Sequence, residues 1–103
     1  MSNTKQVSYK LTTLYSIAGE GDQEIVLSTH ASAFLALWAA HDFLNPLTGT
    51  PVDVDLYMDD VLVSPERVRA ALQSVLRGDY GRRTPAATEA ALRPLLRGEE
   101  VAR

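Results

Sequence analysis

The stretch VDVDLYMDDVLVSPE at residues 52–66 decides the fold of this chain. Residues 52–58 alternate between apolar and mostly polar side chains, and this period of two predicts a half-buried strand. The pair Asp59-Asp60 occupies the position of a two-residue hairpin turn, and residues 61–63 return as the next strand. Because Asp60 stands where glycine is favoured, both a type I and a type I′ turn remain open.

A helix begins directly after this hairpin. Ser64 is an N-cap residue, Pro65 fits the first helical position, and Glu66 places a carboxylate in the first turn. Apolar residues then recur at helical spacing until Gly78, which is typical of a position just after a helix.

A further helix follows a polar linker at residues 79–83. Thr84-Pro85 repeats the signal of a cap followed by proline, and residues 86–92 are predicted to be helical. Pro94 lacks a backbone N–H group and should kink or split this helix, leaving a last turn at 95–97.

Upstream of the central stretch, residues 6–18 alternate in the manner of a strand with aromatic and β-branched side chains. Residues 19–22, Gly-Glu-Gly-Asp, have the composition of a turn. Residues 24–28 read as the returning strand. These features predict a first hairpin.

The segment 31–44 predicts a helix that is capped by Ser28 or Thr29 and ended by Asn45-Pro46. Apolar side chains occur almost all round it, which indicates burial on more than one side. Either the C-terminal helices wrap it or a second chain does. In the second case it forms a homodimer or partner interface through Leu35, Ala39 and Phe43.

The resulting order is β-β-α-β-β-α-α. We therefore expect a single α+β domain over residues 1–103, with a four-stranded antiparallel sheet and helices packed on one face. The other face of the sheet should remain at least partly open to water. Residues 98–103 are expected to fray.

The composition limits the compartment and the chemistry. The chain has no cysteine, which excludes disulfides and thiolate sites and is compatible with a reducing compartment. Its polar N-terminus lacks a signal core, and residues 25–40, which contain no Asp, Glu, Lys or Arg, are too few to span a bilayer. We expect a cytoplasmic protein with no membrane contact.

Charge is distributed unevenly along the chain. Residues 11–66 contain nine carboxylates and no lysine or arginine, whereas residues 67–103 contain eight arginines. A field of one sign steers association with a partner of the opposite sign and repels nucleic acid. We expect an acidic sheet face that no cation of the chain neutralises, formed by Asp53, Asp55, Tyr57, Asp59 and Asp60 and joined by Glu20, Asp22 and Glu24.

These features favour a non-enzymatic module that binds a basic protein surface, with no catalytic residue, metal or cofactor. In size and charge, though in no motif, the chain resembles small phage or mobile-element inhibitors of restriction or CRISPR systems. The resemblance implies an inhibitor that mimics nucleic acid and blocks a nucleic-acid-binding complex.

Two alternatives remain. A homodimeric DNA-associated regulator would use the arginine-rich C-terminal helices. A divalent-metal enzyme would use the aspartates at positions 53, 55, 59 and 60, because carboxylate oxygens suit Mg²⁺ and Ca²⁺. The sequence Tyr57-Met58-Asp59-Asp60 resembles the metal-binding hairpin of reverse transcriptases, but 103 residues cannot contain the rest of a polymerase.

Overall fold

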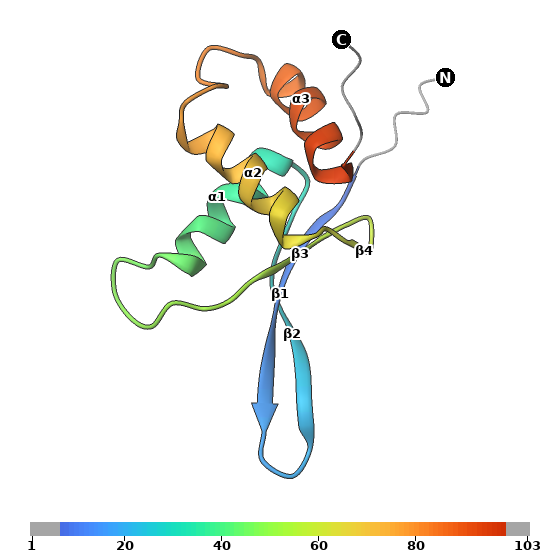
Figure 1. Ribbon diagram of the computed structural model, residues 1–103, viewed down its shortest axis with the longest axis vertical. Coiled ribbons are helices and arrows are strands. Elements are labelled where there is room, and N and C mark those ends of the chain that lie inside the picture. The colour runs from blue at the N-terminus through green and yellow to red at the C-terminus, as the bar shows by residue number, and fades with distance from the viewer. Residues whose placement is uncertain (1–6, 99–103) are drawn as a thin grey trace.

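The computed structural model describes residues 7–98 and shows the predicted single α+β domain (Figure 1). The order of elements agrees with the sequence: β1 (Tyr9–Ile17), β2 (Gly21–His30), α1 (Ala33–Leu44), β3 (Asp55–Met58), β4 (Val61–Leu62), α2 (Pro65–Leu76) and α3 (Pro85–Arg97). Of the tail that was expected to fray, Gly98 is instead the C-cap of α3, with a left-handed φ of 73°. Residues 99–103 lie outside the described part.

The four strands form one antiparallel sheet in the order β2-β1-β3-β4. β1 pairs with β2 along its full length, but with β3 only from Tyr9 to Thr12. β3 begins at Asp55, three residues later than predicted, and residues 52–54 have no regular structure. The distal halves of β1 and β2 therefore form a two-stranded ribbon.

Strand register assigns the side chains to two faces, because residues directly opposite in an antiparallel pair point to the same side. Tyr9 and Leu11 of β1 lie opposite Met58 and Leu56 of β3, and all four are buried on the helix side. The intervening residues point to the opposite side, which we call the open face. Its positions in the strands include Lys10, Leu14, Ser16, Asp22, Glu24, Val26, Asp55, Tyr57 and Leu62, whereas Thr12 has the same register but is buried.

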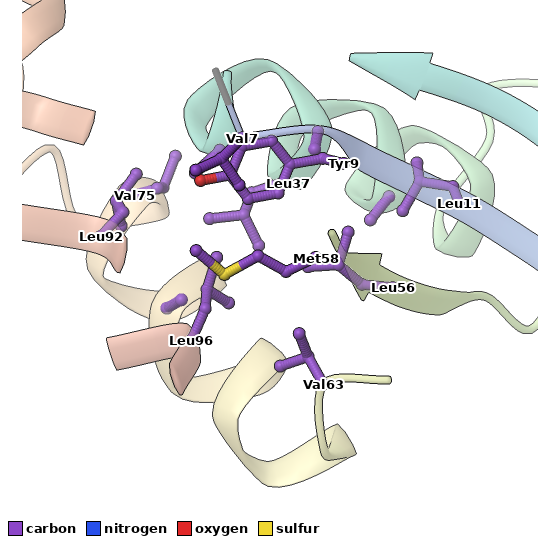
Figure 2. Close-up of a cluster of buried hydrophobic side chains, with 14 residues drawn as sticks. Val7, Tyr9, Leu11, Leu37, Leu56, Met58, Val63, Val75, Leu92 and Leu96 are labelled. Atoms are coloured by element: carbon purple, nitrogen blue, oxygen red, sulfur yellow. The ribbon is translucent and has the colours of Figure 1, made fainter. Parts of the chain in front are cut away.

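The hydrophobic core lies between the sheet and the three helices. In Figure 2 the sheet residues Tyr9, Leu11, Leu56 and Met58 gather with Leu37 of α1, Val75 of α2, and Leu92 and Leu96 of α3. Helix α1 packs on β1 and β2 and also contacts α2 and α3. The C-terminal helices therefore wrap α1, which is the first of the two predicted arrangements.

Two predicted helix features were wrong. Helix α1 starts at Ala33 and not at residue 31, and its N-cap is Ser32, whose Oγ accepts from the Leu35 N–H at 3.4 Å. Strand β2 continues to His30, so the predicted caps lie inside a strand. Helix α3 runs unbroken through Pro94, because Leu92 and Leu96 are buried on either side of the proline and hold both segments on the core.

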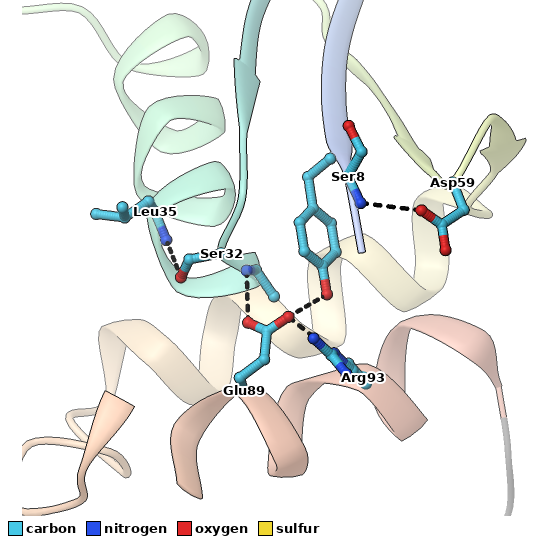
Figure 3. Close-up of polar contacts among 8 residues, drawn as sticks. Ser8, Ser32, Leu35, Asp59, Glu89 and Arg93 are labelled. Carbon is cyan, nitrogen blue, oxygen red and sulfur yellow. Dashed lines mark hydrogen bonds and ion pairs between the residues drawn. The ribbon is translucent and has the colours of Figure 1, made fainter. Parts of the chain in front are cut away.

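The β3–β4 turn is of the type I′ kind, since Asp59 and Asp60 have positive φ angles of 51° and 65°. Ser8, directly before β1, holds this turn through two hydrogen bonds. The Ser8 N–H donates to Asp59 Oδ1 at 2.9 Å (Figure 3). The Asp59 N–H donates to the Ser8 carbonyl at 2.8 Å. The first aspartate of the turn thus ties β3 to the start of β1.

Glu89 of α3 joins three elements (Figure 3). Its Oε2 accepts from the Tyr9 hydroxyl at 2.5 Å and from Arg93 Nε at 2.9 Å, while its Oε1 accepts from the Ala33 N–H at 2.7 Å. The carboxylate therefore also caps the N-terminus of α1, where the helix dipole favours negative charge. We interpret Glu89 as a structural anchor between α3, α1 and β1.

Candidate protein-binding surface

The β1–β2 hairpin extends beyond the helical layer and runs along the long axis of the molecule (Figure 1). From Leu14 through Val26 every residue is exposed. The exposed set includes five large apolar side chains: Leu14, Tyr15, Ile17, Ile25 and Val26. Leu14 and Tyr15 keep 62% and 56% of their surface in water, so this ribbon presents apolar side chains that nothing in the described chain covers.

Tyr57 of β3 lies on the open face between Lys10 of β1 and Leu62 of β4. Its hydroxyl donates to Glu24 Oε2 at 2.7 Å, and Lys10 Nζ lies 4.9 Å from the centre of its ring. The hydrogen bond to Glu24 raises the pKa of the Tyr57 hydroxyl above its ordinary value, with smaller contributions from desolvation and from the charges of Glu24 and Asp55. A tyrosine hydroxyl is protonated at neutral pH in any case, so the phenol can donate to the Glu24 carboxylate there.

The prediction that no cation neutralises this face was wrong in one respect. Lys10 lies on the open face and pairs with Asp60, with 3.8 Å between Nζ and Oδ1. Lys10 is, however, the only lysine or arginine at an open-face position of the four strands. The face thus keeps an excess of carboxylates in Asp22, Glu24 and Asp55.

The structure separates the eight predicted site residues into groups. Asp22, Glu24, Asp55 and Tyr57 share the open face, and Glu20 lies in the turn at the tip of the hairpin. Asp59 instead binds Ser8 and lines a cavity with Arg67 and Arg97, and Asp53 and Asp55 line another with Arg69. Arginines of the C-terminal part therefore line the same cavities as three of the predicted acidic residues.

The alternative of an aspartate metal site finds no support in the geometry. No group of three or more Asp, Glu or His side chains within residues 7–98 is placed so that it could hold a metal ion. The two aspartates of the turn do not join the other two in one group, because Asp59 accepts from the Ser8 N–H while Asp60 pairs with Lys10.

The predicted oligomer residues of α1 do not share one environment. Leu35 is 57% exposed, whereas Ala39 and Phe43 are partly buried and pack against the core.

On the arginine-rich side, Arg77 pairs with Asp79 and Arg93 with Glu89, each at 2.9 Å, while Arg83 lies over the ring of Tyr80. Several of these cations thus have partners within the chain.

Sequence reasoning missed the exposed apolar side chains of the hairpin. The signal was a mismatch in length, since a helix of 12 residues extends about 18 Å while a strand of 10 residues extends about 33 Å. The helix α1 therefore cannot cover all of β1 and β2, and the strand ends must extend past it. Alternation alone groups Tyr15 and Ile17 with the buried residues Tyr9 and Leu11, and so gives no sign of their exposure.

Comparison with known proteins gives no further assignment: no family model, curated protein or solved structure matches this chain. Within residues 7–98, none of the helices combines the length and the apolar character that crossing a bilayer requires.

Proposed function

We propose that this protein is a non-enzymatic binding module whose open face and projecting hairpin hold a basic protein surface. The observation that carries the proposal is the composition of one continuous surface. Leu14 and Val26 supply exposed aliphatic area, Tyr57 adds a partly exposed aromatic ring, and the carboxylates Glu24 and Asp55 lie among them. Partly apolar patches with polar surroundings are typical of protein-binding sites.

Each component has a separate physical role in this function. Tyr57 offers a large side chain that its contacts with Lys10 and Glu24 hold in place, so little conformational entropy is lost when a partner covers it. The carboxylates raise the rate of encounter with a basic partner and disfavour acidic ones. A partner that carries lysine or arginine beside apolar residues matches both the carboxylates and the apolar side chains of this surface.

An inhibitor from a phage or mobile element is the most specific form of this proposal. Such a chain would occupy the nucleic-acid-binding surface of a restriction or CRISPR protein, and nucleic acid would compete with it for that surface. Competition between the partner's nucleic acid and the chain would identify this form of the function.

The test is affinity capture by the full chain from cells that produce it, followed by titration of the purified captured protein. The open-face variant Glu24→Lys/Asp55→Lys is compared with Asp42→Lys/Asp79→Lys, a matched double reversal of exposed acids away from the open face. We expect the open-face variant to raise the Kd at least tenfold, or about 1.4 kcal/mol. The control should bind as the wild type does.

Salt provides a second criterion, because screening weakens exposed charge pairs. Binding by the wild type should weaken between low and high salt, and the open-face variant should show a smaller dependence. Circular dichroism establishes that both variants are folded. Equal capture by the two variants would overturn the proposal.

A further inference from the structure

We propose that the partner segment is an extended strand that adds to the outer edge of β2, with basic side chains at every second position and apolar side chains between them. This inference rests on the proposed function and names the chemistry of the partner. Strand addition lets backbone hydrogen bonds supply affinity while alternate side chains supply specificity.

β2 has the backbone geometry that such an addition needs. It is an edge strand of 10 residues, and every second residue of an edge strand directs its N–H and C=O groups away from its neighbour. β2 contains no proline and no lysine, two of the features that commonly protect edges. The opposite edge, β4, has only two residues and is too short for the same role.

The position of β2 leaves room for another strand. The hairpin extends away from the helices in Figure 1, and residues 21–26 are exposed at every position. A strand along this part of the edge would therefore meet no helix of the chain. Towards His30 the side chains of β2 become partly buried, which limits the accessible edge to the distal half.

The charges of β2 favour a basic strand over a second copy of this chain. Asp22 and Glu24 lie on the open face of the hairpin, and no lysine or arginine occurs anywhere in residues 11–66. Pairing between the distal halves of two β2 strands would bring carboxylates of both copies together, and like charges across strands are destabilising. A strand with lysine or arginine replaces this repulsion by attraction.

Alternation along β2 specifies the pattern of the partner. Asp22 and Glu24 point to the open face, whereas Gln23 and Ile25 point to the other side of the ribbon. An added strand has the same period of two, so its side chains next to the carboxylates should be basic. Those next to Ile25 should be apolar.

The experiment uses the full chain and a defined probe, the capped peptide Thr-Lys-Val-Lys-Val-Lys-Thr. A shuffled peptide of identical composition, Lys-Lys-Lys-Val-Val-Thr-Thr, keeps the charge but loses the alternation. Two further peptides carry N-methyl groups on both valines or on the first two lysines, and each blocks one backbone edge. Calorimetry gives the affinities, and hydrogen exchange of the β2 amides locates the contact.

We expect the alternating peptide to bind at least tenfold more tightly than the shuffled one and to slow exchange of alternate amides within residues 21–26. One of the two N-methylated peptides should bind as the parent does, and the other should lose at least tenfold, because an added strand uses one edge. The variant Asp22→Lys/Glu24→Lys should abolish binding, whereas Asp42→Lys/Asp79→Lys should keep it.

Three outcomes would overturn strand addition. Equal binding of the alternating and shuffled peptides, with no slowed amides in β2, would show contact through side chains alone and would leave the proposed function standing. No binding of any peptide would reject the strand, while the capture experiment separately decides whether a basic protein binds. Self-association of the chain with protection of β2 would identify a second copy as the occupant.

Discussion

The Tyr9 hydroxyl donates a hydrogen bond of 2.5 Å to Glu89 Oε2, which lies 80 residues further along the chain. Tyr9 is completely buried in the central strand, and Glu89 belongs to the last helix. This bond therefore connects the two ends of the described chain through the core. The same carboxylate holds Ala33 and Arg93, so several elements depend on one side chain.

Glu89→Ala should lower the free energy of unfolding by about 2–3 kcal/mol, because it leaves the buried Tyr9 hydroxyl and the Ala33 N–H without their acceptor. Urea denaturation followed by circular dichroism measures the change. Asp79→Ala, which removes an exposed ion pair with Arg77, is the control and should change stability by less than about 1 kcal/mol. Equal effects of the two variants would refute the anchoring role of Glu89.

Stability should fall at alkaline pH because of Tyr9. Burial raises the pKa of its hydroxyl first, and the hydrogen bond to Glu89 and the charge of Glu89 raise it further. Below pH 10 the Tyr9 hydroxyl is protonated in both the folded and the unfolded chain, and its contribution to the free energy of unfolding is fully present. Above that pH the unfolded chain ionises first, so about 1.4 kcal/mol should be lost by pH 11.

The measurement compares wild type with Tyr9→Phe in urea at pH 8 and at pH 11. The variant should be less stable at pH 8 and should show a smaller loss at pH 11. Tyr15→Phe, which removes an exposed tyrosine of the hairpin, is the control and should follow the wild type. Identical pH dependence for all three chains would contradict the prediction.

The sequence predicts those elements whose signals are local. Alternation, caps and the proline at the start of α2 and α3 fix the element order, because each depends on neighbouring residues. The N-cap of α1 was misplaced because pairing of His30 with Tyr9 continues β2 past Thr29. Tertiary contacts overrode the local capping signal there.

The candidate site was only partly predictable for the same reason. Tyr57 and Glu24 were predicted to lie on the acidic face of the sheet. Their hydrogen bond, however, depends on the strand order β2-β1-β3. The approach of Lys10 to Asp60 depends on the register of β1 against β3. Neither the strand order nor the register between strands can be predicted from alternation within a single strand.

The two aspartates of the β3–β4 turn should respond oppositely to glycine. Asp60→Gly should raise stability by roughly 0.5–1 kcal/mol, because glycine adopts a positive φ without the steric cost of Cβ. Asp59→Gly gains the same relief but loses the hydrogen bond from the Ser8 N–H, and should be less stable than wild type by about 1 kcal/mol. Thermal and urea unfolding check both signs, and a stabilised Asp59→Gly chain would show that the bond to Ser8 contributes little.

Thr12 carries a buried hydroxyl that has no hydrogen-bond partner within residues 7–98. Thr12→Val should raise the free energy of unfolding by about 1 kcal/mol, because it replaces an unsatisfied polar group with a methyl group of similar shape. Thr12→Ser keeps the hydroxyl and loses the methyl group, and should lower stability by about 1 kcal/mol. A destabilised Thr12→Val chain would show that the hydroxyl has a partner that contributes to folding.

Shortening the hairpin should separate binding from folding. Replacing residues 16–22 by Asn-Gly joins Tyr15 to Gln23, which lie opposite each other, through a dipeptide that favours a two-residue turn. All the removed side chains are exposed, so the free energy of unfolding should change by less than about 1 kcal/mol. The pair formed by Tyr57 and Glu24 remains in place.

The same variant loses Asp22 and much of the accessible edge of β2. It should therefore bind the alternating lysine–valine peptide at least tenfold more weakly, while its near-native melting temperature shows that the core is intact. Undiminished peptide binding would place the contact nearer to Tyr57, on the retained part of the open face. A large loss of stability would mean instead that the distal hairpin contributes to the core, contrary to the exposure of its side chains.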